Sequence, residues 1–258
     1  MTQPGFADLA GRIVLVTGAS TGIGAAVARG FAACGARVAV HYNRSAAEAE
    51  AVVAGIVAAG GEAWADQADL SDPEAAAPLV ERAAARAGGL DVLVNNAGYV
   101  IRRTPFAEAD AALLRELVDL NFASLVAACH AAIPHFRRAG RGAIVNTTSV
   151  AARNGGGPGT VLYAATKGAV STLTRGLAKE LARDGIRVNA VAPGIIATPL
   201  HARLTPPETF AAMTAQIPMG RAGTAEECAG AYLFLASEAC SGYITGQVIE
   251  VNGGQLMP

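Results

Sequence analysis

The sequence predicts an α/β fold in which helices cover both faces of a doubly wound, seven-stranded parallel sheet. Short apolar runs rich in β-branched residues alternate with helical stretches of ten or more residues, which is the pattern that βαβ crossovers produce. Most of these runs are apolar at nearly every position, and this favours strands buried on both faces. No linker or low-complexity tract divides the chain, so residues 1–258 are expected to form a single domain.

The first half of the chain shows the alternation most clearly. An apolar run leads through a glycine-rich turn into a helical stretch, which Gly35 ends. Gly60 and Gly61 separate the second helix from the third strand, and a helix that begins after Asp72 precedes the fourth strand. The expected strands are 12–17, 37–41, 62–66 and 90–95, and the expected helices are 25–34, 46–59 and 73–87.

The second half begins with a long helix that we expect to bend near Pro134, because proline lacks the N–H that a helix uses. Gly185 ends the following helix, and Thr224 is suited to cap the last one. The proline-rich stretch 193–218 is expected to be irregular. The expected strands are 142–147, 186–191 and 248–251, and the expected helices are 109–138, 161–183 and 224–237.

Charge and residue spacing disfavour several classes of function. A net charge of −1 and an isoelectric point near 6.4 provide no cationic excess for nucleic acid or an anionic membrane. The four cysteines and four histidines show neither C-x-x-C nor H-E-x-x-H spacing, so no metal site is expected. There is no secretory signal and no run of 18 apolar residues, and a soluble, cytoplasmic protein is expected.

The turn after the first strand has the composition of a nucleotide-binding loop. Gly18, Gly22 and Gly24 follow a buried strand and precede a helix. Glycines let a backbone approach a pyrophosphate, and the helix N-terminus favours an anion there. In an open parallel sheet, ligands bind beyond the carboxyl ends of the strands. The sequence therefore predicts a bound nucleotide at this edge.

A tyrosine and a lysine one helical turn apart provide the candidate chemistry. Tyr163 and Lys167 are four residues apart, so both project from one helix face. An ammonium beside a phenol favours the phenolate and lowers the pKa of the phenol towards neutrality. Ser149 follows the strand 142–147 at the sheet edge, where its hydroxyl can hold a substrate oxygen. Asn121 lies among apolar helical neighbours, where an amide needs a local reason.

Together these segments resemble the classical short-chain dehydrogenase/reductase family, with a likeness to its 3-oxoacyl-acyl-carrier-protein reductases and sugar dehydrogenases. The likeness runs from about Leu9 to Gly254. Six ordered matches carry it: TGASTGIG, ADL at 68–70, NNAG at 95–98, the Asn121 helix, Ser149 with YAATK, and PG at 193–194. The resemblance implies a Rossmann fold and a nicotinamide-dependent oxidoreductase.

The resemblance also implies roles for individual residues. Tyr163 would be the general acid/base, and Lys167 would lower its pKa and bind the nicotinamide ribose. Ser149 would orient the substrate carbonyl, and Asn121 would hold a water in a proton relay. Asp69 would contact the adenine, Asn95 the adenine ribose and Thr198 the carboxamide. The rest of the implied cofactor set is Gly18, Ser20, Thr21, Gly22, Ile23, Gly24, Tyr42, Asn43, Arg44, Ser45, Leu70, Ala97, Gly98, Pro193, Gly194 and Ile196.

The end of the second strand favours NADP as the cofactor. NAD-preferring members carry an acidic residue there, whereas this chain has Tyr42 followed by Asn43, Arg44 and Ser45. Arg44 can pair bidentately with a 2′-phosphate, and Ser45 can donate to it. Many NADP-using relatives have a basic residue where this chain has Thr21, so NAD stays open.

The substrate is specified only by class: a secondary alcohol or ketone such as a 3-oxoacyl thioester, sugar, polyol or small cyclic ketone. The expected pocket walls are 99–103, 153–162 and 195–217, the last resembling the family's mobile substrate loop. Arg102, Arg103, His201 and Arg203 are candidates for meeting an anionic group.

Two alternatives remain at this point: a non-catalytic nucleotide-binding or redox-sensing protein on the same fold, and an epimerase or dehydratase with the same tyrosine chemistry. By resemblance, a homodimer or homotetramer would form through helices 109–138 and 161–183.

Overall fold

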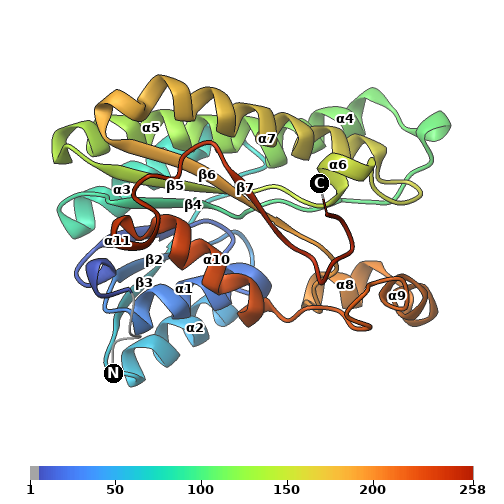
Figure 1. Ribbon diagram of the computed structural model, residues 1–258, viewed down its shortest axis with the longest axis horizontal. Helices are drawn as coiled ribbons and strands as arrows, with labels where there is room; N and C mark the ends of the chain where they lie inside the picture. Colours follow the sequence, from blue (N-terminus) through green and yellow to red (C-terminus); the bar gives the residue numbers. More distant parts are fainter. Residues whose placement is uncertain (1–5, 258) are drawn as a thin grey trace.

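The computed structural model describes residues 6–257, apart from the side chains of residues 200, 203 and 204. Seven parallel strands form one sheet in the order β3-β2-β1-β4-β5-β6-β7 (Figure 1). The strands are β1 Ile13–Val16, β2 Arg37–Tyr42, β3 Glu62–Gln67, β4 Val92–Asn95, β5 Gly142–Thr147, β6 Ile186–Pro193 and β7 Val248–Val251. This sheet with its flanking helices confirms the predicted Rossmann-type α/β fold.

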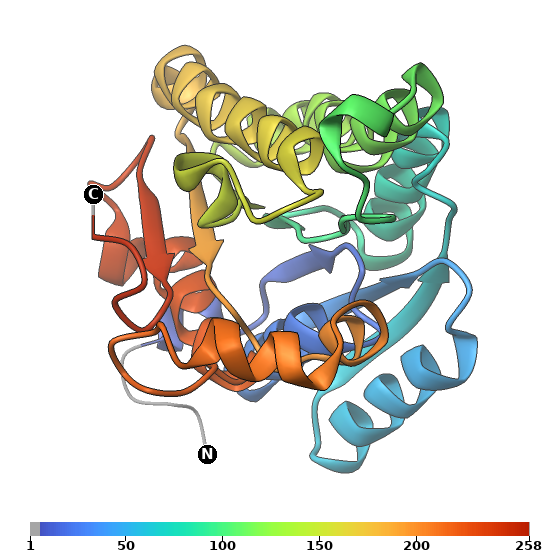
Figure 2. The ribbon, with the colours of Figure 1, turned by 90° about the vertical axis from the view of Figure 1, so that its right-hand side faces the viewer.

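Helices form a layer on each side of the sheet (Figure 1). One layer holds α1 Gly22–Ala33, α2 Ala46–Ala58 and α10 Ala225–Ala236. The other holds α3 Ala76–Ala87, α4 Ala111–Val118, α5 Ser124–Ala139 and α7 Val161–Leu181. The short helices are α6 Ala151–Asn154, α8 Pro199–Leu204, α9 Pro207–Thr214 and α11 Glu238–Ser241. Figure 2 shows α8 and α9, in orange, lying across the edge of the sheet where the strands end.

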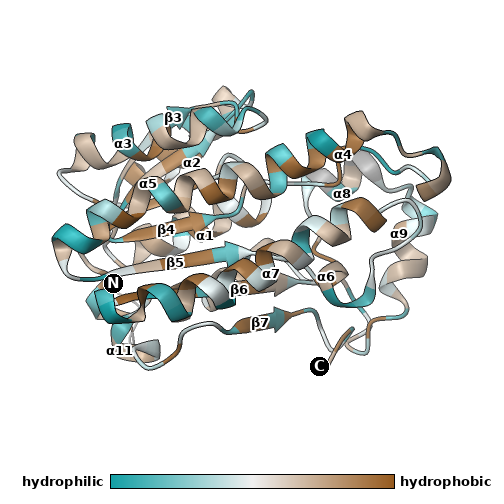
Figure 3. Ribbon diagram, turned by 90° about the horizontal axis from the view of Figure 1, so that it is seen from above, coloured by the Kyte–Doolittle hydropathy of each residue, from teal (hydrophilic) through white to brown (hydrophobic). Residues whose placement is uncertain are grey.

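Successive residues of a central strand pack into different helical layers. Val14 and Val16 join the core beneath α1 and α10, whereas Leu15 joins the core beneath α3 and α5. All three are fully buried. Both faces of the sheet are therefore buried, which is why these strands are apolar at successive positions and do not alternate between apolar and polar residues. Figure 3 shows the resulting hydrophobic strands between helices that carry their hydrophilic residues outward.

The chain reverses its direction across the sheet between β1 and β4. It first moves outward from β1 through β2 to β3, then crosses back to β4 and continues to β7. In such a sheet the loops beyond the carboxyl ends of β1 and β4 diverge, and the crevice between them is where ligands bind. The glycine-rich turn follows β1, at this reversal point.

The structure corrects two of the expectations for the second half. The predicted long helix is interrupted by a π-helical turn at Asp119–Ala123, and Pro134 lies inside α5. The stretch 193–218, expected to be irregular, contains α8 and α9. Their prolines Pro199 and Pro207 lie in the first turn of each helix, where a missing N–H costs nothing.

The helical segment Ala111–Ala139 is long and apolar enough to cross a membrane by length and composition alone. A core helix passes the same test, and here Leu113, Leu117, Leu125 and Phe136 are buried in the fold.

Candidate active site

The glycine-rich turn between β1 and α1 is shaped by its own packing. Gly18 and Gly22 have φ values of +62° and +55°, which glycine adopts without strain. A Cβ on Gly24 would collide with the carbonyl oxygen of Gly18. The turn can therefore bend tightly onto the start of α1, a twelve-residue helix whose N-terminus favours an anion. The half-buried Ser20 and Ile23 and the exposed Thr21 lie in the same turn.

Thr17 and Asn96 fasten this turn to the end of β4. The hydroxyl oxygen of Thr17 accepts from the backbone N–H groups of Asn96 and Ala97 at 2.9 and 3.0 Å. The side-chain amide of Asn96 donates to the carbonyls of Thr17 and Gly18 at 2.9 and 3.0 Å. Sequence reasoning had not selected Asn96, although it belongs to the NNAG segment.

Asn95, expected to meet an adenine ribose, has its side-chain amide inside the protein. It is buried and donates to Asn146 Oδ1 at 3.0 Å and to Cys129 Sγ at 3.2 Å. Both hydrogen bonds of its NH₂ group are therefore made inside the core, and this group does not face a ligand.

The predicted adenosine end lies beyond β2 and β3. Asp69 Oδ1 accepts from Ser71 Oγ at 2.6 Å and from the side-chain amide of Asn43 at 2.9 Å. The Ser71 bonds, and to a smaller extent the charge of Arg44, keep the pKa of Asp69 below its ordinary value. Arg44 is exposed, Tyr42 and Ser45 are half-buried, and Leu70 is buried in the core. The structure thus brings Asn43, Arg44 and Asp69 together.

The structure brings Ser149, Tyr163 and Lys167 together at the carboxyl end of β5. Ser149 lies close enough to Tyr163 for its hydroxyl to act on the pKa of the phenol. Lys167 Nζ lies 5.8 Å from the centre of the Tyr163 ring. Ser149 Oγ also accepts from the N–H of Ala151, which opens α6. The three residues predicted from sequence therefore form one cluster.

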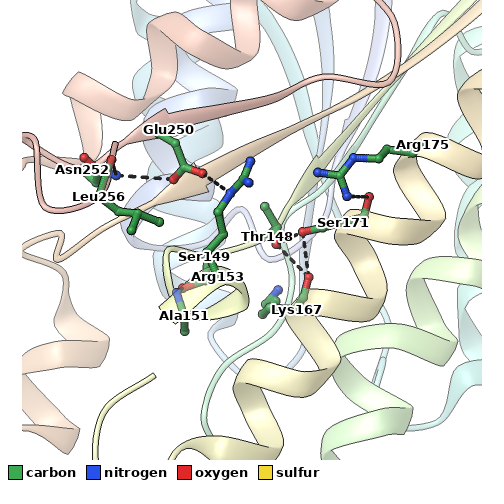
Figure 4. A network of polar contacts seen from close by, with 10 residues as sticks. All are labelled: Thr148, Ser149, Ala151, Arg153, Lys167, Ser171, Arg175, Glu250, Asn252 and Leu256. Carbon is green, nitrogen blue, oxygen red and sulfur yellow. Dashed lines mark hydrogen bonds and ion pairs between the residues drawn. The ribbon is translucent and has the colours of Figure 1, made fainter. Parts of the chain in front are cut away.

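Lys167 is anchored by Thr147, the last residue of β5, and by Thr148, which follows it. Its ammonium donates to the carbonyl oxygen of Thr147 at 2.8 Å, and its own carbonyl accepts from Thr148 Oγ1 at 2.8 Å. Ser171, one turn further along α7, donates to the same carbonyl at 3.0 Å (Figure 4). These contacts fix the register of α7 against the strand.

The pKa values of the pair differ from the sequence-based expectation. Tyr163 keeps some exposed surface, yet the protein around its hydroxyl desolvates it enough to raise the pKa of the phenol; the Ser149 hydroxyl acts in the opposite direction. Burial lowers the pKa of Lys167 to about 8. The expected lowering of the Tyr163 pKa is therefore wrong for the protein alone, because desolvation raises this pKa.

The π-helical turn explains why Asn121 lies in an otherwise apolar helix. Its Nδ2 donates to the carbonyls of Leu117 and Tyr99, both at 3.1 Å, while its Oδ1 is buried with no hydrogen-bond partner. Gly98 has a φ of +143°, and a Cβ there would collide with this oxygen and lie 3.3 Å from Lys167 Nζ. The buried Asn121 oxygen and the Lys167 ammonium therefore lie on either side of Gly98. An unpaired buried acceptor at this place is suited to receive a hydrogen bond from a bound polar group.

The segment after β6 closes the site from the other side. Pro193 and Ile196 are buried, and Ile196 pairs with Gly223. Thr198 begins α8, and its methyl group lies 3.3 Å from where a Cβ of Gly22 would be. The start of α8 therefore lies against the start of α1.

The C-terminal segment, which sequence reasoning did not assign to the site, packs against Gly194. A Cβ on Gly194 would lie 2.8 Å from the Cα of Asn252 and 3.0 Å from Gln255 Oε1. Glu250, on β7, accepts from Arg153 of α6 at 2.8 Å, and Asn252 donates to it at 3.4 Å (Figure 4). The helix that follows Ser149 is thereby tied to β7.

The proposed pocket walls meet beside Tyr163. Arg103 donates to the carbonyl of Pro158 at 3.4 Å, which joins two of the three segments, and the N–H of the adjacent Thr104 donates to the carbonyl of Gly159 at 3.0 Å. A small cavity of about 10 Å³ lies there, and apolar side chains dominate its lining. These are Val100, Phe106, Leu113, Leu117, Val161 and Leu162. The adjacent Ile101 has a φ of +60°, which is strained for a β-branched residue.

Of the basic candidates, Arg102 already pairs with Glu116 at 2.8 Å and lies 3.7 Å from Asp110. Arg103 donates to the carbonyl of Pro158 at 3.4 Å. His201 has its pKa lowered by burial and then by the charge of Arg103, which places these two near each other. The side chain of Arg203 lies outside the described residues.

The site fits a nicotinamide dinucleotide. Its glycine turn bends tightly onto the N-terminus of α1, where an anion is favoured. Asn43 and Arg44 lie at the expected adenosine end, and the Asn121 oxygen without a hydrogen-bond partner lies near Lys167 at the other.

Comparison with known proteins gives consistent results. The sequence model of a family described as enoyl-(acyl carrier protein) reductase matches residues 18–255. A 3-oxoacyl-[acyl-carrier-protein] reductase of Synechocystis sp. is 40% identical over 249 residues, which are 96% of this chain and 98% of the relative. Two solved structures are 38% identical with a TM-score of 0.87. One is an NADH-dependent reductase A1-R′ complexed with NAD, covering 98% of this chain and 100% of that one. The other is a Burkholderia cenocepacia short chain dehydrogenase in complex with NADP, covering 96% and 98%.

Proposed function

Because the chain belongs to the classical short-chain dehydrogenase/reductase family and is an NAD(P)-dependent oxidoreductase acting on alcohol and keto groups, we propose that Tyr163, Lys167, Ser149 and Asn121 carry its reaction. The observation behind this assignment is the cluster that Ser149 and Tyr163 form with the buried Lys167. The cluster lies at the carboxyl end of β5, on the sheet edge where the glycine-rich turn lies.

The reaction is the interconversion of a secondary alcohol and a ketone. When bound, a reduced nicotinamide would supply the hydride that the carbonyl carbon takes up in the reductive direction. The Tyr163 hydroxyl donates its proton to the carbonyl oxygen, which the Ser149 hydroxyl holds by a hydrogen bond. The Lys167 ammonium stabilises the phenolate that remains, and the buried oxygen of Asn121 holds a water through which a proton returns to the site.

The proposed substrate class is a secondary alcohol or ketone, such as a 3-oxoacyl thioester, sugar, polyol or small cyclic ketone. The name of the Synechocystis relative supports the first of these. Segment 195–217, which contains α8 and α9, is the proposed loop that covers the substrate.

The proposed cofactor preference is for NADP over NAD. Arg44 is exposed beside Asp69 and makes no ion pair with any residue whose side chain the structure describes. It is therefore available to a 2′-phosphate. We expect Arg44→Ala to raise the KM for NADPH about tenfold and to leave the KM for NADH within about twofold. Equal effects on both cofactors would contradict this preference.

The proposed assembly is a homotetramer or homodimer of a cytoplasmic protein. The Ala111–Ala139 and α7 helices lie side by side on one face, and Leu114, Val126 and Val161 there are 43%, 37% and 49% exposed. Apolar surface at these positions supports a contact between copies.

The deciding experiment is an assay of alcohols and ketones at 340 nm with NADP(H) and NAD(H). We expect Tyr163→Phe to lower kcat at least about a hundredfold, since it removes the proton donor, and to bind NADPH as the wild type does. A phenylalanine variant with ordinary turnover would overturn the assigned role of Tyr163. Product formation without a matching change in nicotinamide absorbance would overturn the redox reaction.

A further inference from the structure

The imidazole of His41 lies beneath the proposed cofactor site and touches two of its loops. His41 lies near the end of β2 and is 2% exposed. The N–H of Gly18 donates to His41 Nδ1 at 2.9 Å, and Nε2 lies 3.1 Å from the carbonyl oxygen of Ala68. Gly18 belongs to the glycine-rich turn, and Ala68 directly precedes Asp69. One side chain thus bridges the loop for the diphosphate and the loop for the adenine.

The two partners fix the tautomer of the ring. A backbone N–H can only donate, so Nδ1 must carry a lone pair. The hydrogen therefore resides on Nε2, which donates to Ala68. A protonated imidazolium would place a second N–H against that of Gly18. Burial lowers the pKa of His41 to about 4, although the Ala68 bond and the charges of Asp66 and Asp69 act in the opposite direction; Arg82 lowers it further.

The backbone on either side of the ring holds the same two loops. The carbonyl of His41 accepts from the N–H of Ala19 at 2.7 Å, and the carbonyl of Tyr42 accepts from the N–H of Ala68 at 3.1 Å. The next residues, 43–45, are those proposed for the 2′-phosphate. Three parts of the cofactor site therefore share one point of attachment.

We propose that His41 is a positioning residue for the dinucleotide: as a neutral, Nε2-protonated imidazole it sets the spacing between the Gly18 turn and the Ala68 loop. This inference rests on the proposed cofactor site. His41 acts through Gly18 and Ala68, because it is too buried to touch a ligand. Its loss should weaken cofactor binding and leave the chemical step intact.

The test compares His41→Leu, which removes both contacts, with His41→Asn, whose amide oxygen can take the place of Nδ1 and keep the Gly18 bond. Asn189→Leu is the matched control. Asn189 is 1% exposed in β6 and likewise accepts from a backbone N–H, of Gln247, and donates to a backbone carbonyl, of Ile244, both at 2.9 Å. It lies away from the glycine turn, towards β7.

We expect the Kd for NADPH, measured by fluorescence titration, to rise about tenfold in His41→Leu and less in His41→Asn. The kcat at saturating cofactor should stay within about twofold. Asn189→Leu should lower the melting temperature and keep the wild-type Kd. The His41 signal is identified as the one that the imidazole ¹⁵N spectrum of the wild type shows and that of His41→Asn lacks. In the cofactor-free protein at pH 7, we expect this signal to be that of a neutral imidazole with its proton on Nε2.

Wild-type affinity in His41→Leu, an equal loss of affinity in Asn189→Leu, or a proton on Nδ1 would each overturn the role of His41. A wild-type protein that binds neither NADPH nor NADH would overturn the cofactor site itself, and this proposal with it. The two failures are therefore distinguishable.

Discussion

Lys167→Met should stabilise the folded protein while abolishing its proposed activity. Lys167 is 2% exposed, and burial lowers its pKa to about 8 from an ordinary value of 10.5. Holding that charge out of water costs about 3 kcal/mol, and the bond to Thr147 returns about 1 kcal/mol. Methionine has a similar length and no charge. We therefore expect a free energy of unfolding about 2 kcal/mol higher at pH 7.

The pH dependence of this gain follows from the same pKa values. The unfolded chain keeps its proton up to about pH 10.5, and the folded protein releases it near pH 8. Between these values the unfolded state binds more protons, so the wild type gains stability as pH rises. Below pH 8 Lys167 is protonated in both the folded and the unfolded state, so the folded protein bears the full free-energy cost of burying the charge. The advantage of the methionine variant should thus be constant below pH 8 and mostly gone at pH 10.

Urea unfolding followed by circular dichroism at pH 7 and pH 10 measures both effects. The matched control is Lys179→Met, because Lys167 and Lys179 are the two lysines of the chain and Lys179 is exposed on the same helix. It should change stability little at either pH. A Lys167→Met protein less stable than the wild type at pH 7, or an advantage equal at both pH values, would refute the argument that burial of this charge is costly.

Two further substitutions test the frame of the site. Gly24→Ala should weaken NADPH binding at least about tenfold in a calorimetric titration, because the new methyl group would collide with the carbonyl of Gly18; unchanged affinity would contradict the packing argument. Thr224→Ala should cost about 1 kcal/mol of stability, because Thr224 and Glu227 cap α10 reciprocally, with Glu227 N–H donating at 3.3 Å and Thr224 N–H at 2.8 Å. An unchanged melting temperature would show that this capping box is dispensable.

The sheet could be predicted from sequence because its strands are short, apolar and buried on both faces. The residues on β1 that pack into opposite layers are all valine or leucine, so no alternation had to be resolved. Helices α8 and α9 were missed because they lie in the proline-rich stretch 193–218, which was expected to be irregular. Proline breaks a helix interior but suits a first turn, and composition alone does not distinguish the two positions.

The candidate site shows a similar division. Residues one turn apart on a helix, such as Tyr163 and Lys167, could be paired from sequence, since helical periodicity fixes their relative placement. The direction in which the Tyr163 pKa shifts could not be predicted from sequence, because it depends on how much protein surrounds the hydroxyl. Of the two adjacent asparagines at the end of β4, the sequence singled out Asn95, whose amide faces the core, and not Asn96, which supports the turn.

The contrast between the two lysines bears on how the protein can be handled. Amine-reactive reagents need an accessible, neutral amine, and the Lys167 amine is enclosed on α7 by the end of β5. Lys179 is exposed towards the other end of that helix. Coupling to an activated ester resin or a fluorescent dye will therefore label the side chain of Lys179 and spare that of Lys167.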